Sequence, residues 1–347
     1  MIVIFDPQPP LMRWYKITDN GMTVEECTYK NDWEHEVSFD LKNITHIACV
    51  LYNGGDAISE AVVTINPDLI ATVEKCVPLL PERNQMTLET IQYWHEKLPT
   101  VNHTLLCETA LYTKLPPKAR NYAIPAELRE KGVKRYGGYG LQHAFMLDKI
   151  KPALNGSAGK LVSIFLGPQT NVTAFYEGKP LETSIGFSPA EGIPSLHGSG
   201  DTDASFVFLM QENGYELDDI APAFSKKGGL CALLGKEDCT FPDVINSGAD
   251  NLTYKVLRYS LIKYIGYAVT QLGGADAFSF HGEYDIKTIE PFIRDVCRNF
   301  KFLGLTCADK PETKKGFVDL TGKELSVKVF YTPCKRAEVL EKYANQK

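Results

Sequence analysis

Short apolar runs alternate along this chain with longer segments in which apolar residues recur every three or four positions. The strand-like runs are MIVIF, HIACVLY, TLLCET, KLVSIFL and DAFSF, and the helix-like segments cover residues 69–76, 87–97 and 251–272. Runs of this length that are rich in β-branched and aromatic residues suit buried strands, whereas the longer repeat suits helices that pack on a sheet. The alternation therefore predicts an α/β fold.

The segment from Asp250 to Leu272 shows the helical repeat most clearly. Its predicted buried face consists of Leu252, Val256, Leu257, Ser260, Leu261, Tyr264 and Ile265. Gly273-Gly274 follows directly. Glycine commonly ends a helix because it adopts the left-handed conformation without a steric penalty. We therefore expect a helix that ends at Leu272, followed by a buried strand at DAFSF.

The length of the chain predicts two domains. With 347 residues it exceeds the size, roughly 300 residues, at which a single hydrophobic core usually stops growing. Proline clusters at 78–81 and 116–117 mark loops, and the second cluster lies near the expected domain boundary.

Charge and hydropathy exclude several classes of partner. The formal net charge of -6 argues against broad electrostatic binding to nucleic acid or to anionic membranes. The longest apolar stretches are shorter than the ~20 residues that a membrane-spanning helix needs. The opening MIVIFD lacks the features of a secretory signal. We therefore expect a cytoplasmic protein with no nucleic-acid partner and no membrane partner.

Nine cysteines are scattered from Cys27 to Cys334 without any Cys-x-x-Cys pair. Disulfide frameworks and zinc sites usually show an even number of cysteines or closely spaced pairs. The pattern therefore predicts reduced thiols in a reducing compartment and no metal site.

The stretch CETALYTKLPPKARNYAIPAELREKGVKRYGGYGLQH, from Cys107 to His143, resembles the acetate kinase family. Three further segments, TSIGFSPAEG, KYIGYAVTQLGGADA and FLGL, resemble family segments in the same order. The resemblance implies the α/β two-lobed fold of acetate and sugar kinases, Hsp70 and actin, which is ribonuclease H-like. The implied lobes are residues 1–109, completed by 334–347, and residues 110–333, which carry the nucleotide-side and dimer-forming elements. It also implies a homodimer and phosphoryl transfer between ATP and a carboxylate.

Phosphoryl transfer needs positive charge around the transferring group and a metal ion that bridges phosphate oxygens. The family's first phosphate loop corresponds to residues 6–13, where three prolines remove amide donors, Asp6 adds a negative charge and Arg13 replaces a lysine. A family arginine corresponds to Val50, close to Asn53. The resemblance thus places Arg13, Val50 and Asn53 at substrate-binding positions that have lost much of their positive charge.

Five residues stand at or beside the catalytic positions of the family. Glu108 matches an aspartate and keeps its charge, whereas Arg83 and Tyr139 each match a histidine. A neutral phenol donates one hydrogen bond but does not supply the charge of an imidazolium. Gly198 matches an arginine, and the neighbouring His197 is mostly neutral at pH 7. Arg83 is one place where a cation is gained, and it is either an anion ligand or a solvated surface residue.

The family's nucleotide-binding positions correspond to Gly167, Gln169, Thr240, Gly282 and Glu283. The proline before Gln169 removes an amide donor from a phosphate loop, and the turn at 281–284 is shorter than its family counterpart. Near the C-terminus a basic residue, Arg336, replaces the glutamate that serves the metal. Because Mg²⁺ is held through carboxylates and phosphate oxygens, the substitutions argue against ATP and Mg²⁺, the cofactors of the family.

Three hypotheses follow from these substitutions. The first is a non-catalytic acetate kinase-like protein with an eroded phosphoryl-transfer site and a small anion or carboxylate as its ligand. The second is a carboxylate kinase-type phosphotransferase with an altered substrate or phosphoryl donor, which uses Arg13, Arg83 and Glu108. The third is a classical acetate kinase, to which Gly198 and Arg336 are the main objections.

Overall fold

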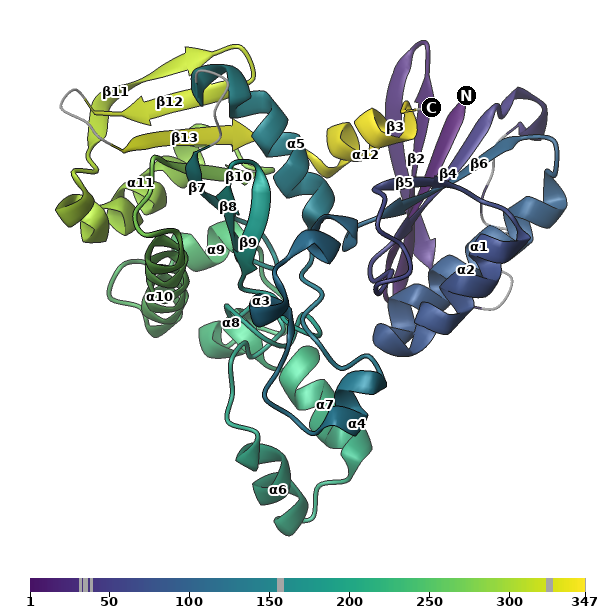
Figure 1. Ribbon diagram of the computed structural model, residues 1–347, viewed down its shortest axis with the longest axis horizontal. Helices are drawn as coiled ribbons and strands as arrows, with labels where there is room; N and C mark the ends of the chain where they lie inside the picture. Colours follow the sequence, from purple (N-terminus) through teal and green to yellow (C-terminus); the bar gives the residue numbers. More distant parts are fainter. Residues whose placement is uncertain (31–32, 34–36, 38–39, 155–158, 323–326, 347) are drawn as a thin grey trace. The chain divides into compact units, whose positions relative to one another are not determined.

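The computed structural model describes residues 1–30, 33, 37, 40–154, 159–322 and 327–346 (Figure 1). These residues form two compact units. Unit 1 comprises Met1–Thr113, Gly138–Leu141 and Arg336–Lys347, and unit 2 comprises Lys114–Gly137 and Gln142–Lys335. The chain therefore returns to unit 1 at its C-terminus.

Unit 1 is built on a sheet that has six strands in the described part of the chain, in the order β3-β2-β1-β4-β6-β5. The strands are β1 (Ile2–Gln8), β2 (Leu11–Thr18), β3 (Gly21–Thr28), β4 (His46–Leu51), β5 (Val62–Thr64) and β6 (Asn102–Cys107), and the longer helices are α1 (Pro67–Cys76), α2 (Pro81–Lys97) and α12 (Arg336–Ala344). Strands β1, β4 and β6 are parallel neighbours, so their carboxyl ends share one edge of the sheet. Helix α2 covers β1 and β4, where Trp94 stacks on Phe5 with ring centroids 5.4 Å apart.

Unit 2 holds a second sheet, with seven strands among the described residues, in the order β11-β12-β13-β10-β7-β8-β9. The strands are β7 (Lys160–Phe165), β8 (Asn171–Tyr176), β9 (Lys179–Thr183), β10 (Ala277–Gly282), β11 (Cys307–Lys314), β12 (Phe317–Thr321) and β13 (Lys328–Pro333). The helices are α3 (Pro117–Arg120), α4 (Ala126–Glu130), α5 (Gly140–Ile150), α6 (Ser205–Glu212), α7 (Leu217–Ser225), α8 (Gly229–Leu234), α9 (Phe241–Ile245), α10 (Leu252–Leu272) and α11 (Ile286–Cys297). Helix α10 packs on β7, β8 and β9 (Figure 1).

The elements expected from periodicity are confirmed. The five apolar runs form β1, β4, β6, β7 and β10, and the helical segments lie in α1, α2 and α10. Helix α10 ends at Leu272, and Gly273 caps it in the left-handed conformation with φ 62°. The predicted buried face is correct at Leu257, Leu261 and Ile265 and wrong at its start, because Leu252 in the first turn is 61% exposed.

Residues 6–13 form no open loop after the first strand. Asp6, Pro7 and Gln8 extend β1, and they pair with Arg13, Met12 and Leu11 of β2. Pro9 and Pro10 make the turn between the two strands. The segment that corresponds to a phosphate loop in the family is therefore the end of a tight hairpin.

The expectation that all cysteines are reduced is wrong for one pair. Cys231 and Cys239 form a disulfide in unit 2. They lie eight residues apart, on α8 and just before α9, where a short loop brings the two elements together. Cys27, Cys49, Cys76, Cys107, Cys297, Cys307 and Cys334 are free thiols. None of the helices in the described ranges is both long and apolar enough to cross a membrane.

Candidate functional site

A buried ionic cluster lies at the carboxyl ends of the parallel strands of unit 1. The guanidinium of Arg336 donates to both carboxylate oxygens of Asp6, with Nε 3.0 Å from Oδ2 and Nη2 3.1 Å from Oδ1. Its Nη1 also donates to Glu108, whose second oxygen accepts the backbone N–H of Leu141 at 3.1 Å. The hydroxyl of Tyr52 donates to Asp6 at 2.6 Å. The two carboxylates therefore share one internal cation.

Asp6 and Arg336 each stabilise the charged form of the other. Burial raises the pKa of Asp6, but the charge and hydrogen bonds of Arg336 outweigh it, so the pKa lies below its ordinary value. Burial lowers the pKa of Arg336, whereas Asp6 and Glu108 raise it well above its ordinary value. Both oxygens of each carboxylate thus already accept hydrogen bonds from protein donors, and the positive charge of Arg336 lies between the two carboxylates.

Arg83, predicted as an anion ligand, lies beside this cluster in the first turn of α2. Its guanidinium carbon is 4.2 Å from the centroid of the Tyr52 ring, which is a cation–π contact. Among the described residues, Arg83 makes no side-chain hydrogen bond and no ion pair. The side chain is half-buried, so its N–H donors can be reached by a small anion.

Tyr139 lies in the segment of unit 1 that contains Gly138–Leu141. It is not a glycine and yet has φ 57°, a conformation that costs on the order of 1 kcal/mol. The following Gly140 approaches the Glu108 carbonyl so closely that a Cβ atom would lie 2.3 Å from that oxygen. Burial raises the pKa of the Tyr139 phenol, so it stays a neutral hydrogen-bonding group near pH 7.

The substrate-binding positions predicted in unit 1 have partners within that unit. Val50 is fully buried in β4, and its carbonyl accepts the Thr87 hydroxyl at 2.8 Å. The side-chain oxygen of Asn53 accepts the Gly55 N–H at 3.0 Å. Arg13 forms a salt bridge with Glu26 on the neighbouring strand, at 2.8 Å. Of the predicted cationic positions in this unit, Arg83 is the one left available for a ligand.

Two of the predicted nucleotide-side positions, Gly167 and Gly282, follow β7 and end β10 in unit 2. The Leu166 N–H donates to the His281 carbonyl at 2.8 Å, which brings Gly167 and Gly282 together. Glu283 is exposed, and Thr240 caps α9 through a reciprocal hydrogen-bond pair with Asp243. The side chain of Gln169 donates to the Pro189 carbonyl at 3.3 Å. The structure thus brings Gly167 and Gly282 together, whereas Thr240 and Gln169 make local hydrogen bonds.

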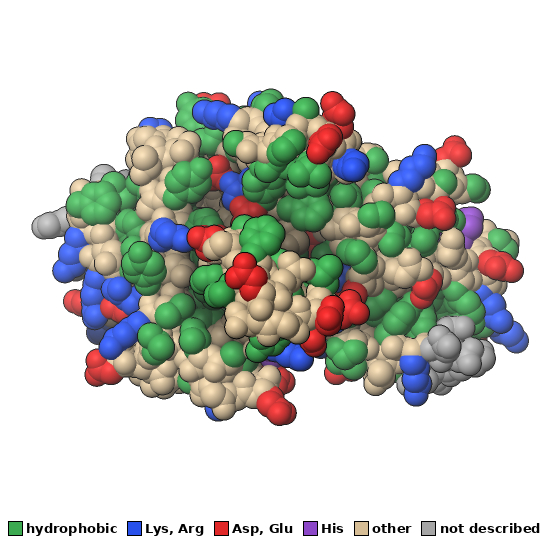
Figure 2. All heavy atoms as spheres, turned by 90° about the horizontal axis from the view of Figure 1, so that it is seen from below, with side chains coloured by type: hydrophobic (Ala, Val, Ile, Leu, Met, Phe, Trp, Pro, Cys, Tyr) green, Lys and Arg blue, Asp and Glu red, His purple; other side chains and the backbone are tan. Residues whose placement is uncertain are grey.

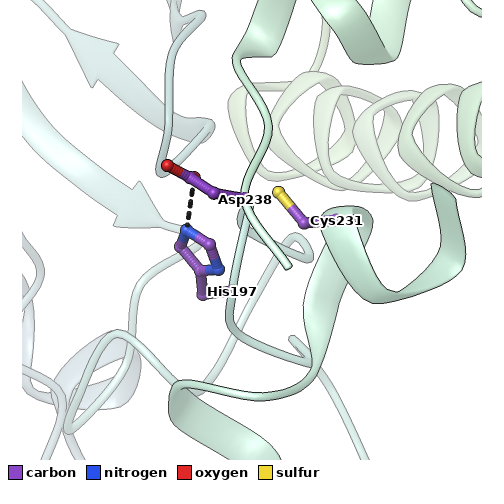
Figure 3. Close-up of side chains that lie close together, drawn as sticks. All are labelled: His197, Cys231 and Asp238. Atoms are coloured by element: carbon purple, nitrogen blue, oxygen red, sulfur yellow. Dashed lines mark ion pairs between the residues drawn. The ribbon is translucent and has the colours of Figure 1, made fainter. Parts of the chain in front are cut away.

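Gly198 and His197 lie in a tight loop of unit 2. The Gly198 N–H donates to the Ser195 hydroxyl at 2.7 Å, and a Cβ atom at 198 would lie 2.6 Å from the same oxygen. The loop is thus shaped around a glycine where the family carries an arginine. His197 faces Asp238, with Nε2 3.3 Å from Oδ1 (Figure 3).

Sequence reasoning missed Tyr52 and did not foresee that Asp6, Glu108 and Arg336 meet. A usable signal was present, because Asp6 lies near the end of β1, Tyr52 follows β4 and Glu108 follows β6. The carboxyl ends of parallel neighbours lie at one edge of a sheet, where ligand sites commonly form. What the sequence could not supply was the return of Arg336 to this edge from the far end of the chain.

Comparison with solved structures defines the class of fold. The structure matches a propionate kinase from Francisella tularensis with a TM-score of 0.83, at 19% identity over 99% of this chain and 98% of that chain. It matches an acetate kinase of Porphyromonas gingivalis with a TM-score of 0.80, at 22% identity over 98% of both chains. The expected two-lobed acetate kinase type of fold is therefore confirmed.

Sequence comparison narrows the class to a family. The model of the acetokinase family matches residues 17–335. An acetate kinase of Natranaerobius thermophilus is 30% identical over 323 residues, which cover 90% of this chain and 79% of that protein. An acetate kinase of Thermosipho africanus is 30% identical over 288 residues, or 80% of this chain and 70% of that protein. The chain belongs to the acetokinase family.

Proposed function

We propose that this chain is an acetate kinase-like protein that binds a small anion or carboxylate in unit 1 and lacks Mg²⁺-dependent phosphoryl transfer from ATP to acetate. The observation that carries this proposal is the buried Arg336, which is ion-paired with both Asp6 and Glu108. Mg²⁺ requires oxygen ligands at about 2.1 Å in near-octahedral geometry. A guanidinium between the two carboxylates competes with a metal ion for their oxygens and repels a divalent cation.

The loss of positive charge elsewhere supports the same conclusion. In phosphoryl transfer one arginine is worth on the order of 10³ to 10⁵ in rate. Here Val50 and Gly198 stand at two arginine positions of the family, and both are enclosed by their neighbours. Losses within one site do not multiply, but each of them lowers the rate.

Arg83 supports the anion-binding part of the proposal. Its guanidinium is positioned over Tyr52 and has donors to spare, a suitable arrangement for a carboxylate or a phosphate. The same observation favours the alternative function, a carboxylate kinase-type phosphotransferase with an altered substrate or donor. In that alternative Glu108 would need to be released from Arg336 during the reaction.

Hydroxamate trapping of acetyl phosphate tests the catalytic part. Purified protein with ATP, Mg²⁺ and acetate should give no product above the background without enzyme, while an acetate kinase from a relative gives a strong signal. Turnover by this chain that disappears in Glu108→Ala would show that the proposal is wrong.

Thermal melting in phosphate, acetate and chloride of equal ionic strength tests the anion site. A ligand that binds the folded state raises the melting temperature with its concentration, whereas ions excluded from the surface act on all variants alike. Wild type and Arg13→Ala should show a saturable gain in phosphate or acetate beyond the gain from ion exclusion, and Arg83→Ala should lose this saturable part. An undiminished gain in Arg83→Ala would exclude Arg83 as the ligand.

A further inference from the structure

Three side chains of kinds that bind metals lie together in unit 2. They are His197, Cys231 and Asp238, and one potential ligand atom from each lies within 4.8 Å of the other two. Figure 3 shows the imidazole of His197 directed at the Asp238 carboxylate, with the Cys231 sulfur nearby. Imidazole nitrogen, thiolate sulfur and carboxylate oxygen are the ligand atoms that Zn²⁺ accepts in proteins.

The backbone holds the three residues in this arrangement. The Cys231 N–H donates to the Leu196 carbonyl at 2.9 Å, and the Leu230 N–H donates to the Ser195 carbonyl at 2.9 Å. Gly229 makes this close approach possible, because a Cβ atom there would lie 2.5 Å from the Ser195 carbonyl oxygen. The start of α8 is therefore fixed against the loop that carries His197.

The carboxylate is also oriented before any ligand binds. Oδ1 of Asp238 accepts the Cys239 N–H at 2.8 Å and lies 3.3 Å from Nε2 of His197. Zinc–nitrogen and zinc–oxygen bonds of about 2.1 Å in a tetrahedral site put these two atoms about 3.4 Å apart. The observed separation therefore already suits a shared zinc ion.

The arrangement also has an explanation without a metal, in which Cys231 forms a disulfide and His197 and Asp238 form a surface ion pair. The His197 and Asp238 side chains are 40% and 88% exposed, and such a pair contributes at most about 1 kcal/mol. The disulfide explains why the Cys231 sulfur lies beside Asp238, because Cys239 directly follows Asp238 in the chain, but it does not by itself place a His197 nitrogen within 4.8 Å of that sulfur. Exposure of two ligands and burial of the third would instead allow an ion to enter from solvent and meet an enclosed sulfur.

We propose that reduction of the Cys231–Cys239 disulfide converts this cluster into a Zn²⁺ site held by the Cys231 thiolate, Nε2 of His197 and a carboxylate oxygen of Asp238. A dithiol reductant supplies two electrons and two protons, so the S–S bond breaks, two thiols form and the reductant becomes a disulfide. Zinc then displaces the proton of the Cys231 thiol into solvent. In the oxidised state the Cys231 sulfur is bonded to Cys239 and does not act as a thiolate ligand.

The test compares zinc binding by oxidised and reduced protein. Protein is reduced with a dithiol, desalted under nitrogen and titrated with Zn²⁺ by calorimetry, and with Co²⁺ to record the thiolate-to-cobalt charge-transfer band. Reduced wild type should bind one ion and show the band, and oxidised wild type should do neither. Equal binding in both states, or a reduced protein that binds no ion, would overturn the proposal.

Matched variants test the ligand set. His197→Ala and Cys231→Ser should lose the stoichiometric ion after reduction. Cys239→Ser leaves Cys231 as a permanent thiol, so it should bind zinc without any reductant. Cys307→Ser removes the free thiol that is partly exposed and should bind like wild type. Loss of the ion in Cys307→Ser but not in Cys231→Ser would place the site elsewhere, and loss in Cys239→Ser would contradict the three-residue ligand set.

Discussion

At the scale of single residues, the buried guanidinium of Arg336 lies between the carboxylates of Asp6 and Glu108. An isolated buried charge costs several kcal/mol of desolvation, and an ion pair offsets this only when its geometry and hydrogen bonds are good. The two-pronged contact with Asp6 and the Tyr52 hydroxyl meet that condition. The Arg336 guanidinium therefore offsets part of the cost of burying the two carboxylates.

A second buried polar group sets the pH dependence of stability. His143 is fully buried, with Nδ1 2.6 Å from the Ser163 hydroxyl and Nε2 2.5 Å from Oδ1 of Asn171. Burial lowers the pKa of His143 to about 4, and burial also lowers the pKa of the adjacent His281 well below its ordinary value. In the folded state both rings are therefore neutral at pH 7.

In the unfolded chain His143 binds a proton below about pH 6.5, whereas in the folded chain it does so only below about pH 4. The free energy of unfolding is therefore greatest above pH 6.5 and falls as the pH drops toward 4. We expect the free energy of unfolding to decrease by about 2 kcal/mol between pH 7.5 and pH 5 from His143 alone. Urea denaturation at both pH values measures this, and His143→Asn should show a smaller decrease. An equal decrease in the variant would contradict the assignment.

At the scale of elements, replacing glycine by alanine inside helix α10 and at its C-terminal cap should change the stability of unit 2 in opposite directions. Gly273 caps the helix with φ 62°, a conformation that strains any residue with a Cβ atom. Gly266 lies inside the helix, and a Cβ atom there meets no atom within 4 Å. Gly273→Ala should destabilise unit 2 by about 1 kcal/mol, and Gly266→Ala should stabilise it by about 0.5 to 1 kcal/mol. Chemical denaturation of both variants checks this, and destabilisation by both would show that the cap is not the cause.

The elements that the sequence predicted are those with a strong local pattern. Strand β1 and helix α10 have continuous apolar residues or a clear repeat, and their boundaries follow from glycine and from short loops. The polar strand β3 was missed, since most of its side chains are exposed and its stability comes from pairing with β2. The Cys231–Cys239 disulfide depends on how α8 and α9 meet, which residue spacing alone does not encode.

Single residues of the candidate site were predictable from the sequence, but their meeting in one cluster was not. Glu108 and Arg83 were identified through the resemblance to the acetate kinase family, and the structure places them within one cluster that also contains Tyr52. The closure of the cluster by Arg336 depends on a contact over 228 residues with Glu108. No local pattern reports such a contact.

At the scale of the whole molecule, we propose a homodimer in which a second copy covers α6 and the start of α7. Helix α6 has no buried residue, and Phe208, Leu209 and Leu217 are 64%, 54% and 63% exposed. Figure 2, seen from the side on which α6 lies, shows hydrophobic side chains on the surface that faces the viewer. An apolar patch of this kind is commonly covered in an assembly.

Light scattering coupled to size-exclusion chromatography measures the assembly. Wild type should elute with twice the chain mass, and Phe208→Asp should shift it toward one chain mass because a desolvated charge opposes association. Phe302→Asp changes another exposed phenylalanine, 76% exposed, and should leave the mass unchanged. A monomeric wild type, or a dimer that survives Phe208→Asp, would contradict this proposal.

Binding of Mg²⁺ to unit 1 tests most directly whether Arg336 has replaced the metal. The measurement is the melting temperature across a Mg²⁺ titration, with and without ATP, for wild type, Arg336→Glu and Arg336→Gln. We predict no Mg²⁺-dependent gain in wild type. Arg336→Glu should melt at a lower temperature without metal, because three buried carboxylates repel one another, and should recover as Mg²⁺ is added. Arg336→Gln, which adds no carboxylate, should recover less. A saturable, ATP-linked Mg²⁺ stabilisation of the wild type would contradict the account.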